Sequence, residues 1–159
     1  MRALGSPVAA VYLAAIIGSV GGGSASSRLI AGGLRVVRAR FAVMLACSAL
    51  AFALFAVMDV HWLWGAVALL GLGIVAHQGF SVNLFALITD VFEPERVGTI
   101  TSLGALSGNL AGMAVVWLLG VHLTAGGRYT PFLDFAAISY ALALLWLWLL
   151  LPRLLRNAA

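Results

Sequence analysis

The stretch of sequence from Ala76 to Phe92 reads AHQGFSVNLFALITDVF. It places four polar side chains inside a strongly apolar region, and these belong to His77, Gln78, Ser81 and Asn83. A polar group in an apolar environment costs free energy unless it forms hydrogen bonds. A helix in this region must therefore place these side chains either against a neighbouring helix or along a polar path.

The composition of the whole chain indicates that its main solvent is lipid. Of the 159 residues, 64% are hydrophobic and only 9% are charged, whereas soluble domains carry about 25% charged residues. Five apolar blocks follow one another, and each is close to the roughly 20 residues that a helix needs to cross a bilayer. The blocks cover residues 7–31, 41–58, 62–92, 97–122 and 131–151.

These blocks are continuous, without the alternating pattern of a membrane β-barrel. Open strands are excluded because their backbone groups would lack partners in lipid. The sequence therefore predicts an all-α polytopic membrane bundle with five transmembrane helices. No cleavable signal peptide is evident, so we expect the first block to be a retained crossing.

The arginines are distributed unequally between the two ends of the predicted helices. Only Arg2 and Arg128 lie at one end. The other end carries Arg28, Arg35, Arg38, Arg40, Arg96, Arg153 and Arg156. The positive-inside rule assigns the arginine-rich end, and with it the C-terminus, to the cytoplasm. The arginines flank apolar blocks and form no basic face, so we expect no nucleic-acid partner.

Helix geometry separates the four polar residues of the third block. At 100° per residue, His77 and Ser81 share one face with Gln78 beside them, whereas a straight helix points Asn83 elsewhere. This face offers an imidazole, an amide and a hydroxyl to a substrate, although such groups also join one helix to another. His77 is either a proton carrier, with an unperturbed pKa near 6.5, or a neutral hydrogen-bonding group. We expect Asn109 to be another buried polar residue, which lines the same cavity or caps a neighbouring backbone.

Small residues recur every four positions in two blocks. They are Gly18, Gly22 and Ser26 in the first block and Gly104, Gly108 and Gly112 in the fourth. Such stripes let helix backbones approach closely in lipid, either as fixed packing or as a surface on which helices slide. Asp90 ends the third block, where it forms a gating ion pair with a loop arginine or stays solvated.

The motifs resemble one transporter family over nearly the whole chain. The segment AHQGFSVNLFALITDVFEPERVGTITSLGALSGNLAGM (76–113) resembles the tenth and eleventh helices of the anion:cation symporter branch of the major facilitator superfamily, particularly its hexuronate and sugar-acid transporters. The segment 11–41 is similar to the eighth helix and the basic loop after it, and 127–152 resembles the last loop and twelfth helix. The chain departs from the family pattern at two places. Ile16 or Ile17 stands where the eighth helix of the family commonly has an acid, and Phe80 replaces the usual Trp.

The resemblance implies a C-terminal fragment, helices eight to twelve of a twelve-helix fold, in the inner membrane. It implies proton-coupled symport of a hexuronate or related sugar acid by alternating access, completed by the missing N-terminal half. Gln78, Ser81 and Asn83 fall on motif positions of the tenth helix, and Asn109 falls in the eleventh. The resemblance implies that these residues, with His77, bind substrate, and that Gln78, Ser81 and Asn109 contact sugar hydroxyls. The implied gate or loop charges are those of Arg28, Arg38 and Arg40. The arginine and acid expected to bind the carboxylate and carry the proton lie in the missing half.

Two alternatives remain beside the transporter fragment. One is a five-crossing membrane protein that acts in interaction or assembly and does not transport. The other, a membrane enzyme, is least favoured because His61, His77 and His122 lie at different levels and form no metal-ligand cluster. We therefore expect no enzymatic activity, no metal and no cofactor.

Overall fold

The computed structural model describes residues 5–157, with side chains through Leu151, and nearly all of this part is helical. The elements are α1 (Gly5–Ala31), α2 (Val36–Ala51), the 3-10 helix η2 (Phe52–Asp59), α3 (Leu63–Val91), α4 (Pro94–Thr124) and α5 (Thr130–Asn157). No strand occurs in this described part. Counting α2 and η2 as one span, five helices are long and apolar enough to cross a membrane. The chain is thus an all-helical, multi-pass membrane protein, as the sequence predicted.

The helices do not begin and end where the apolar blocks do, because local residues set the helix ends. The helix α2 begins at Val36, five residues before the apolar block, because arginines near the membrane boundary do not interrupt a helix. Pro94 is the first residue of α4, a position that suits proline because its missing N–H has no helical partner. Gly33 and Gly126 follow α1 and α4 with φ of 94° and 81°, a backbone conformation that favours glycine.

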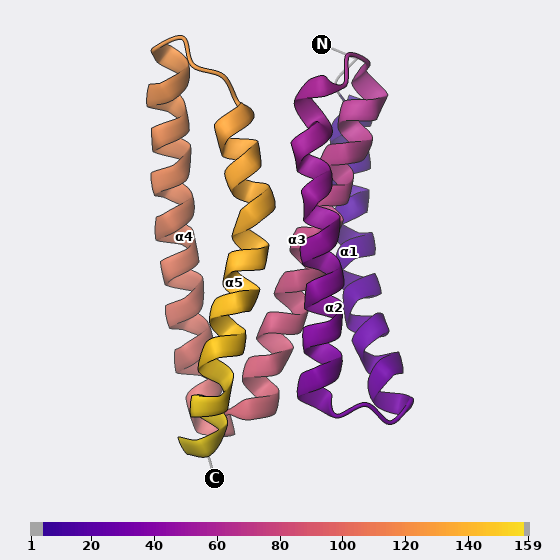
Figure 1. The fold of residues 1–159 in the computed structure, drawn as a ribbon, viewed down its shortest axis with the longest axis vertical. Helices are drawn as coiled ribbons and strands as arrows, with labels where there is room; N and C mark the ends of the chain where they lie inside the picture. The colour runs from indigo at the N-terminus through magenta and orange to yellow at the C-terminus, as the bar shows by residue number, and fades with distance from the viewer. Residues whose placement is uncertain (1–4, 158–159) are drawn as a thin grey trace.

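The helices run alternately up and down, and α3 holds the packed part of the bundle together (Figure 1). Along much of its length α3 packs against α1, and it also contacts α2, η2 and α5. The helix α5 packs mainly against α2 and η2. From α2 and α5, Met44, Cys47 and Leu144 join Phe80 of α3 in a buried apolar cluster. This arrangement places the polar middle of α3 between α1 and α5.

The closest approach in the bundle is between the backbones of α1 and α3. A Cβ atom added at Gly22 would lie 2.6 Å from Cα of Gly79, and one at Gly18 would lie 2.5 Å from the carbonyl oxygen of Val75. A Cβ added at Gly79 would also lie 2.8 Å from Sγ of Cys47 on α2. Three helices thus meet where only glycine fits without displacement of its neighbours.

The helix α4 is arranged differently from the others. All of its residues are described, and none of them is buried. Figure 1 shows it on the far side of α5 from the α1–α3 pair, joined to its neighbours by the links at its two ends. Its apolar surface, including Leu110, Met113 and Trp117, is therefore open along its length.

Candidate functional site

One polar cluster joins α1, α2 and α3 at the arginine-rich end of the bundle. Nε of Arg40 lies 3.0 Å from Oδ2 of Asp90, and Nη1 of Arg40 donates to Oγ of Ser26 at 2.7 Å. Ser26 in turn donates to the carbonyl oxygen of Gly23. The side chains of Arg40 and Asp90 are only 15% and 27% exposed, so this ion pair is partly shielded from solvent. Asp90 thus forms an ion pair with an arginine, which the sequence placed in the basic loop but which lies on α2, and a gating role for this pair stays a prediction.

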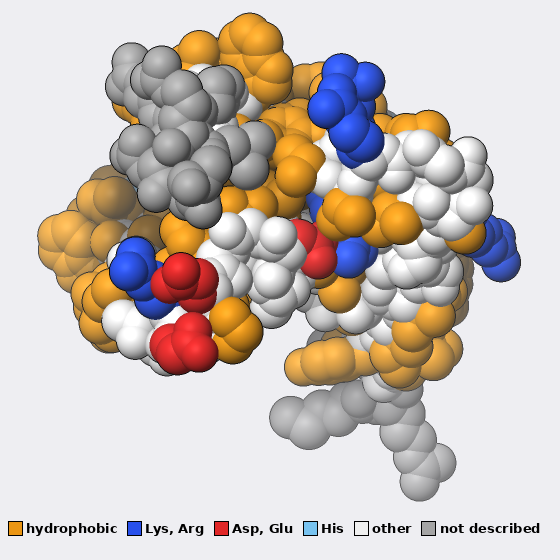
Figure 2. All heavy atoms as spheres, turned by 90° about the horizontal axis from the view of Figure 1, so that it is seen from below, with side chains coloured by type: hydrophobic (Ala, Val, Ile, Leu, Met, Phe, Trp, Pro, Cys, Tyr) orange, Lys and Arg blue, Asp and Glu red, His pale blue; other side chains and the backbone are white. Residues whose placement is uncertain are grey.

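Charged side chains gather at this end of the molecule, which Figure 2 views directly. Arg96 pairs with Glu93 at 3.4 Å, and both side chains are more than 70% exposed. Arg28 and Arg38 are also exposed, and neither forms an ion pair with another residue in the described part of the chain. Of the three arginines assigned to the basic loop, only Arg40 therefore lies in a network between helices.

Asn83 is fully buried at the contact between α1 and α3. Its Nδ2 donates to the carbonyl oxygens of Gly22 at 3.1 Å and of Gly79 at 2.8 Å. Its Oδ1 is buried without a hydrogen-bond partner among the residues that the structure describes. Because α3 is continuous, Asn83 points away from the face of Ser81, as helix geometry predicted. In this position it joins two helices and reaches no open surface.

His77 and Gln78 are adjacent in sequence but face different neighbours. Nδ1 of His77 lies 2.9 Å from the hydroxyl oxygen of Tyr140 on α5, within hydrogen-bond distance. Tyr140 also packs edge-on against Phe80, with ring centroids 5.5 Å apart. The sequence analysis did not single out Tyr140, although the two adjacent hydroxyls of Ser139 and Tyr140 within the apolar block 131–151 were a signal that could have found it.

Gln78 lies on the side of α3 that faces α1. With Tyr12, Ile16 and Ser19 of α1 it lines an open hollow of about 380 Å³. Its Cβ lies 3.0 Å from the position of a Cβ added at Gly18, so the close approach of the two backbones places the amide at this seam. Ser81, one turn after His77, is half-buried. The polar residues expected on one face are thus distributed over the α1 and α5 sides of α3.

Asn109 lies apart from these groups. It is exposed on α4, in a shallow depression that Gly108, Gly112 and Trp117 also line. Nothing in the described chain comes within 4 Å of a Cβ added at Gly104, Gly108 or Gly112. The glycine stripe of α1 therefore lies at a helix contact, whereas the stripe of α4 faces open space.

The site and fold together define a multi-pass helical membrane protein with polar groups at the centre of one span. Among the described residues, no group of three or more His, Cys, Asp or Glu side chains could hold a metal ion. Comparisons with protein-family models, with curated proteins and with solved structures find no match to this chain. The similarity to sugar-acid symporters therefore stays a prediction from the sequence motifs.

Proposed function

We propose that this chain forms one side of a transporter that moves a hexuronate or related sugar acid across the inner membrane together with a proton. The observation that carries the proposal is the position of His77 at the midpoint of α3, next to Gln78, on a helix long enough to span the bilayer. Polar groups at such depth are costly and mark substrate or proton paths. Transporter binding sites typically lie near the bilayer midplane.

Each polar residue then has a chemical role. The amide of Gln78 and the hydroxyl of Ser81 contact hydroxyl groups of the sugar acid, whereas Asn109, exposed on α4 apart from these groups, has no part in this contact. His77 binds substrate or accepts the proton, and the hydroxyl of Tyr140 at 2.9 Å orients its ring. Asn83, bonded to two backbone carbonyls, fixes the position of α3. Helices outside this sequence supply the positive charge for the carboxylate.

The Arg40–Asp90 pair is the gate in this proposal. It ties α2 to α3 at the end that the positive-inside rule assigns to the cytoplasm. Opening toward the cytoplasm requires the two helices to separate, which breaks the ion pair and its bond to Ser26. Alternating access by rocking of helix groups is consistent with such a contact at one end.

Uptake measurements test the proposal. Cells expressing the gene as it occurs in the genome are supplied with radiolabelled glucuronate or galacturonate, with and without an uncoupler. We expect uptake that needs the proton gradient, and Gln78→Ala should raise the KM about tenfold with normal membrane insertion. Thr124→Ala removes an exposed hydroxyl at the end of α4 and serves as the control. No uptake of either sugar acid, or a Gln78→Ala variant with unchanged kinetics, would reject the proposal.

The open surface of α4 favours a second candidate, a membrane interaction protein without transport activity. A helix with no buried residue and a stripe of three glycines is suited to pack against a further membrane helix. A Met113→Cys variant can be cross-linked to a partner protein through the open surface of α4. Together with the uptake assay, this experiment distinguishes a transporter from an interaction protein. A cross-linked partner without any uptake supports this second function.

A further inference from the structure

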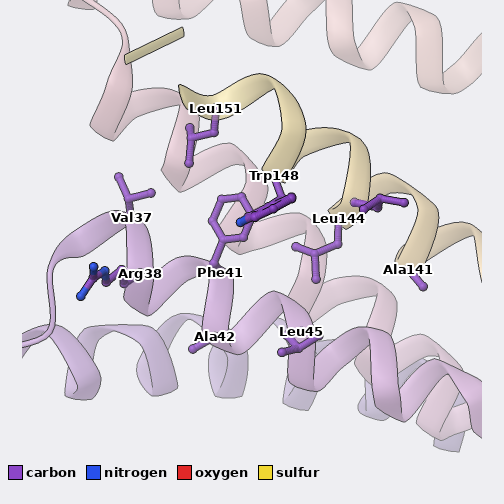
Figure 3. Close-up of a pocket in the computed structure, with 10 residues that line it drawn as sticks. Val37, Arg38, Phe41, Ala42, Leu45, Ala141, Leu144, Trp148 and Leu151 are labelled. Carbon is purple, nitrogen blue, oxygen red and sulfur yellow. The ribbon is translucent and has the colours of Figure 1, made fainter. Parts of the chain in front are cut away.

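A groove runs between α2 and α5 near the arginine-rich end of the bundle (Figure 3). Phe41 of α2 and Leu144, Trp148 and Leu151 of α5 line it, and its volume is about 630 Å³. We call it the α2–α5 groove. Ligand pockets typically have volumes of about 300–1,000 Å³, so the groove is large enough for part of a lipid-sized molecule.

The groove opens sideways, toward the region that hydrocarbon occupies around a membrane-spanning helix. Leu45 and Trp148, which line it from opposite helices, are each 61% exposed. Its lining is apolar almost throughout, and Figure 3 shows Phe41 and Trp148 facing each other across it. An acyl chain is the ligand group that matches such a surface.

One charged residue breaks the apolar lining. Arg38 lies at the end of the groove nearest the α1–α2 link, as Figure 3 shows. Unlike Arg40, which is held by Asp90 and Ser26, it forms no ion pair with a residue that the structure describes. The segment 28–40 contains four arginines and no acid. The groove therefore combines an apolar wall with an available positive charge at its end.

We propose that the α2–α5 groove binds one anionic phospholipid, with an acyl chain between Phe41 and Trp148 and the phosphate at Arg38. A guanidinium can bind phosphate oxygens through two parallel hydrogen bonds, and basic pockets between membrane helices suit anionic headgroups. A second copy of the chain fits less well, because a two-fold dimer would place the arginine-rich segments of both copies at the same level. The site does not depend on the proposed transport function.

Native mass spectrometry of the purified full chain tests this lipid site. The protein is incubated in detergent with phosphatidylglycerol or phosphatidylcholine of identical acyl chains. We expect one phosphatidylglycerol to be retained preferentially, and Arg38→Ala to lower its retention about fivefold, the effect of one arginine at a membrane surface. Arg38→Lys should keep most of the retention. The matched control is Arg96→Ala, which removes an equal charge at the same end but outside the groove.

Two further variants test the acyl-chain part of the site. Ala42→Phe places a ring in the groove and should reduce retention of the lipid, whereas Ala114→Phe on the open surface of α4 should not. Phosphatidylglycerol with brominated acyl chains should quench the fluorescence of Trp148. This quenching should be smaller in the Trp148→Phe variant, which lacks the tryptophan of the groove. Circular dichroism verifies that each variant is folded.

Several results would overturn the proposal. Equal retention of the two lipids by the unmodified chain would show that the headgroup charge is not recognised. Equal losses in Arg38→Ala and Arg96→Ala would show only general attraction to the arginine-rich end. A dimer that Ala42→Phe dissociates, without retained lipid, would show that the groove is occupied by a second copy.

Discussion

The guanidinium Nε of Arg40 lies 3.0 Å from carboxylate Oδ2 of Asp90, which joins α2 to α3 across 50 positions of sequence. Both side chains are partly shielded from solvent, so removal of one leaves the other with a charge that solvent compensates only in part. The same guanidinium also reaches Ser26 on α1. This single arginine therefore connects three helices at one end of the bundle.

Replacement of Arg40 tests how much this cluster stabilises the chain. Arg40→Ala should lower the free energy of unfolding by about 1–3 kcal/mol, because a hydrogen-bonded charge pair is lost. The measurement is unfolding in mixed micelles followed by circular dichroism. Arg96→Ala removes a largely exposed pair and should change stability by less than about 0.5 kcal/mol. Equal losses of stability in Arg40→Ala and Arg96→Ala would contradict the larger contribution that we assign to the Arg40 cluster.

A methyl group at Gly22 tests the close approach of α1 and α3. Gly22→Ala should destabilise the chain by about 1–3 kcal/mol, because the added Cβ would lie 2.6 Å from backbone Cα of Gly79, which has no flexible side chain to move. Gly21→Ala is the matched control, since nothing in the described chain lies within 4 Å of its Cβ. Similar unfolding curves for both variants would show that the helices are not in contact at Gly22.

A double-mutant cycle tests the hydrogen bond between His77 and Tyr140. Single variants His77→Ala and Tyr140→Phe and the double variant should give a coupling energy of about 0.6 kcal/mol, the average found for hydrogen bonds between membrane helices, and no more than about 1.7 kcal/mol. The same cycle with Tyr129→Phe, an exposed tyrosine outside the membrane core, should give a coupling near zero. A zero coupling for Tyr140 as well would mean that the bond does not form in the membrane.

A substitution at Gly108 tests whether α4 contributes to the stability of the chain itself or to its contact with a further helix. Gly108→Leu should leave unfolding of the isolated chain unchanged within about 0.5 kcal/mol, because no described residue lies near this position. In the proposed complete transporter the same variant should reduce uptake, since the glycine stripe then meets a further helix. Loss of stability in the isolated chain would instead show that α4 packs within it.

Cysteine labelling tests the orientation in the membrane. In a Cys47→Ala background, a cysteine at Leu34 in the α1–α2 link should react with an impermeant maleimide only after permeabilisation. A cysteine at His61, in the link before α3, should react in intact cells. Labelling of Leu34→Cys from outside would reverse the orientation that the arginines predict.

The sequence predicted the five spans because the hydrophobic signal of a membrane helix is local and continuous. It did not distinguish the two glycine stripes, which have the same spacing. The stripe of α1 lies at a contact because Gly79 stands opposite Gly22, and that depends on the partner surface. Likewise, the relative rotation of α2 and α3 decides that Arg40, and not another arginine of the segment 28–40, pairs with Asp90. Such long-range pairings are set by packing and are absent from local patterns.

The isolation of α4 has a consequence for how the protein meets bilayers of different thickness. The backbone contact at Gly22 and Gly79 fixes the mutual inclination of α1 and α3. By contrast, α4 has no buried residue and makes few contacts with other helices, such as that of His122 with Phe132 on α5, so a change in its tilt disturbs little packing. Tilting is the usual response of a long apolar helix to hydrophobic mismatch, at a small cost per ångström. Changes in lipid chain length should therefore be absorbed mainly by α4, with the remainder of the bundle keeping its shape.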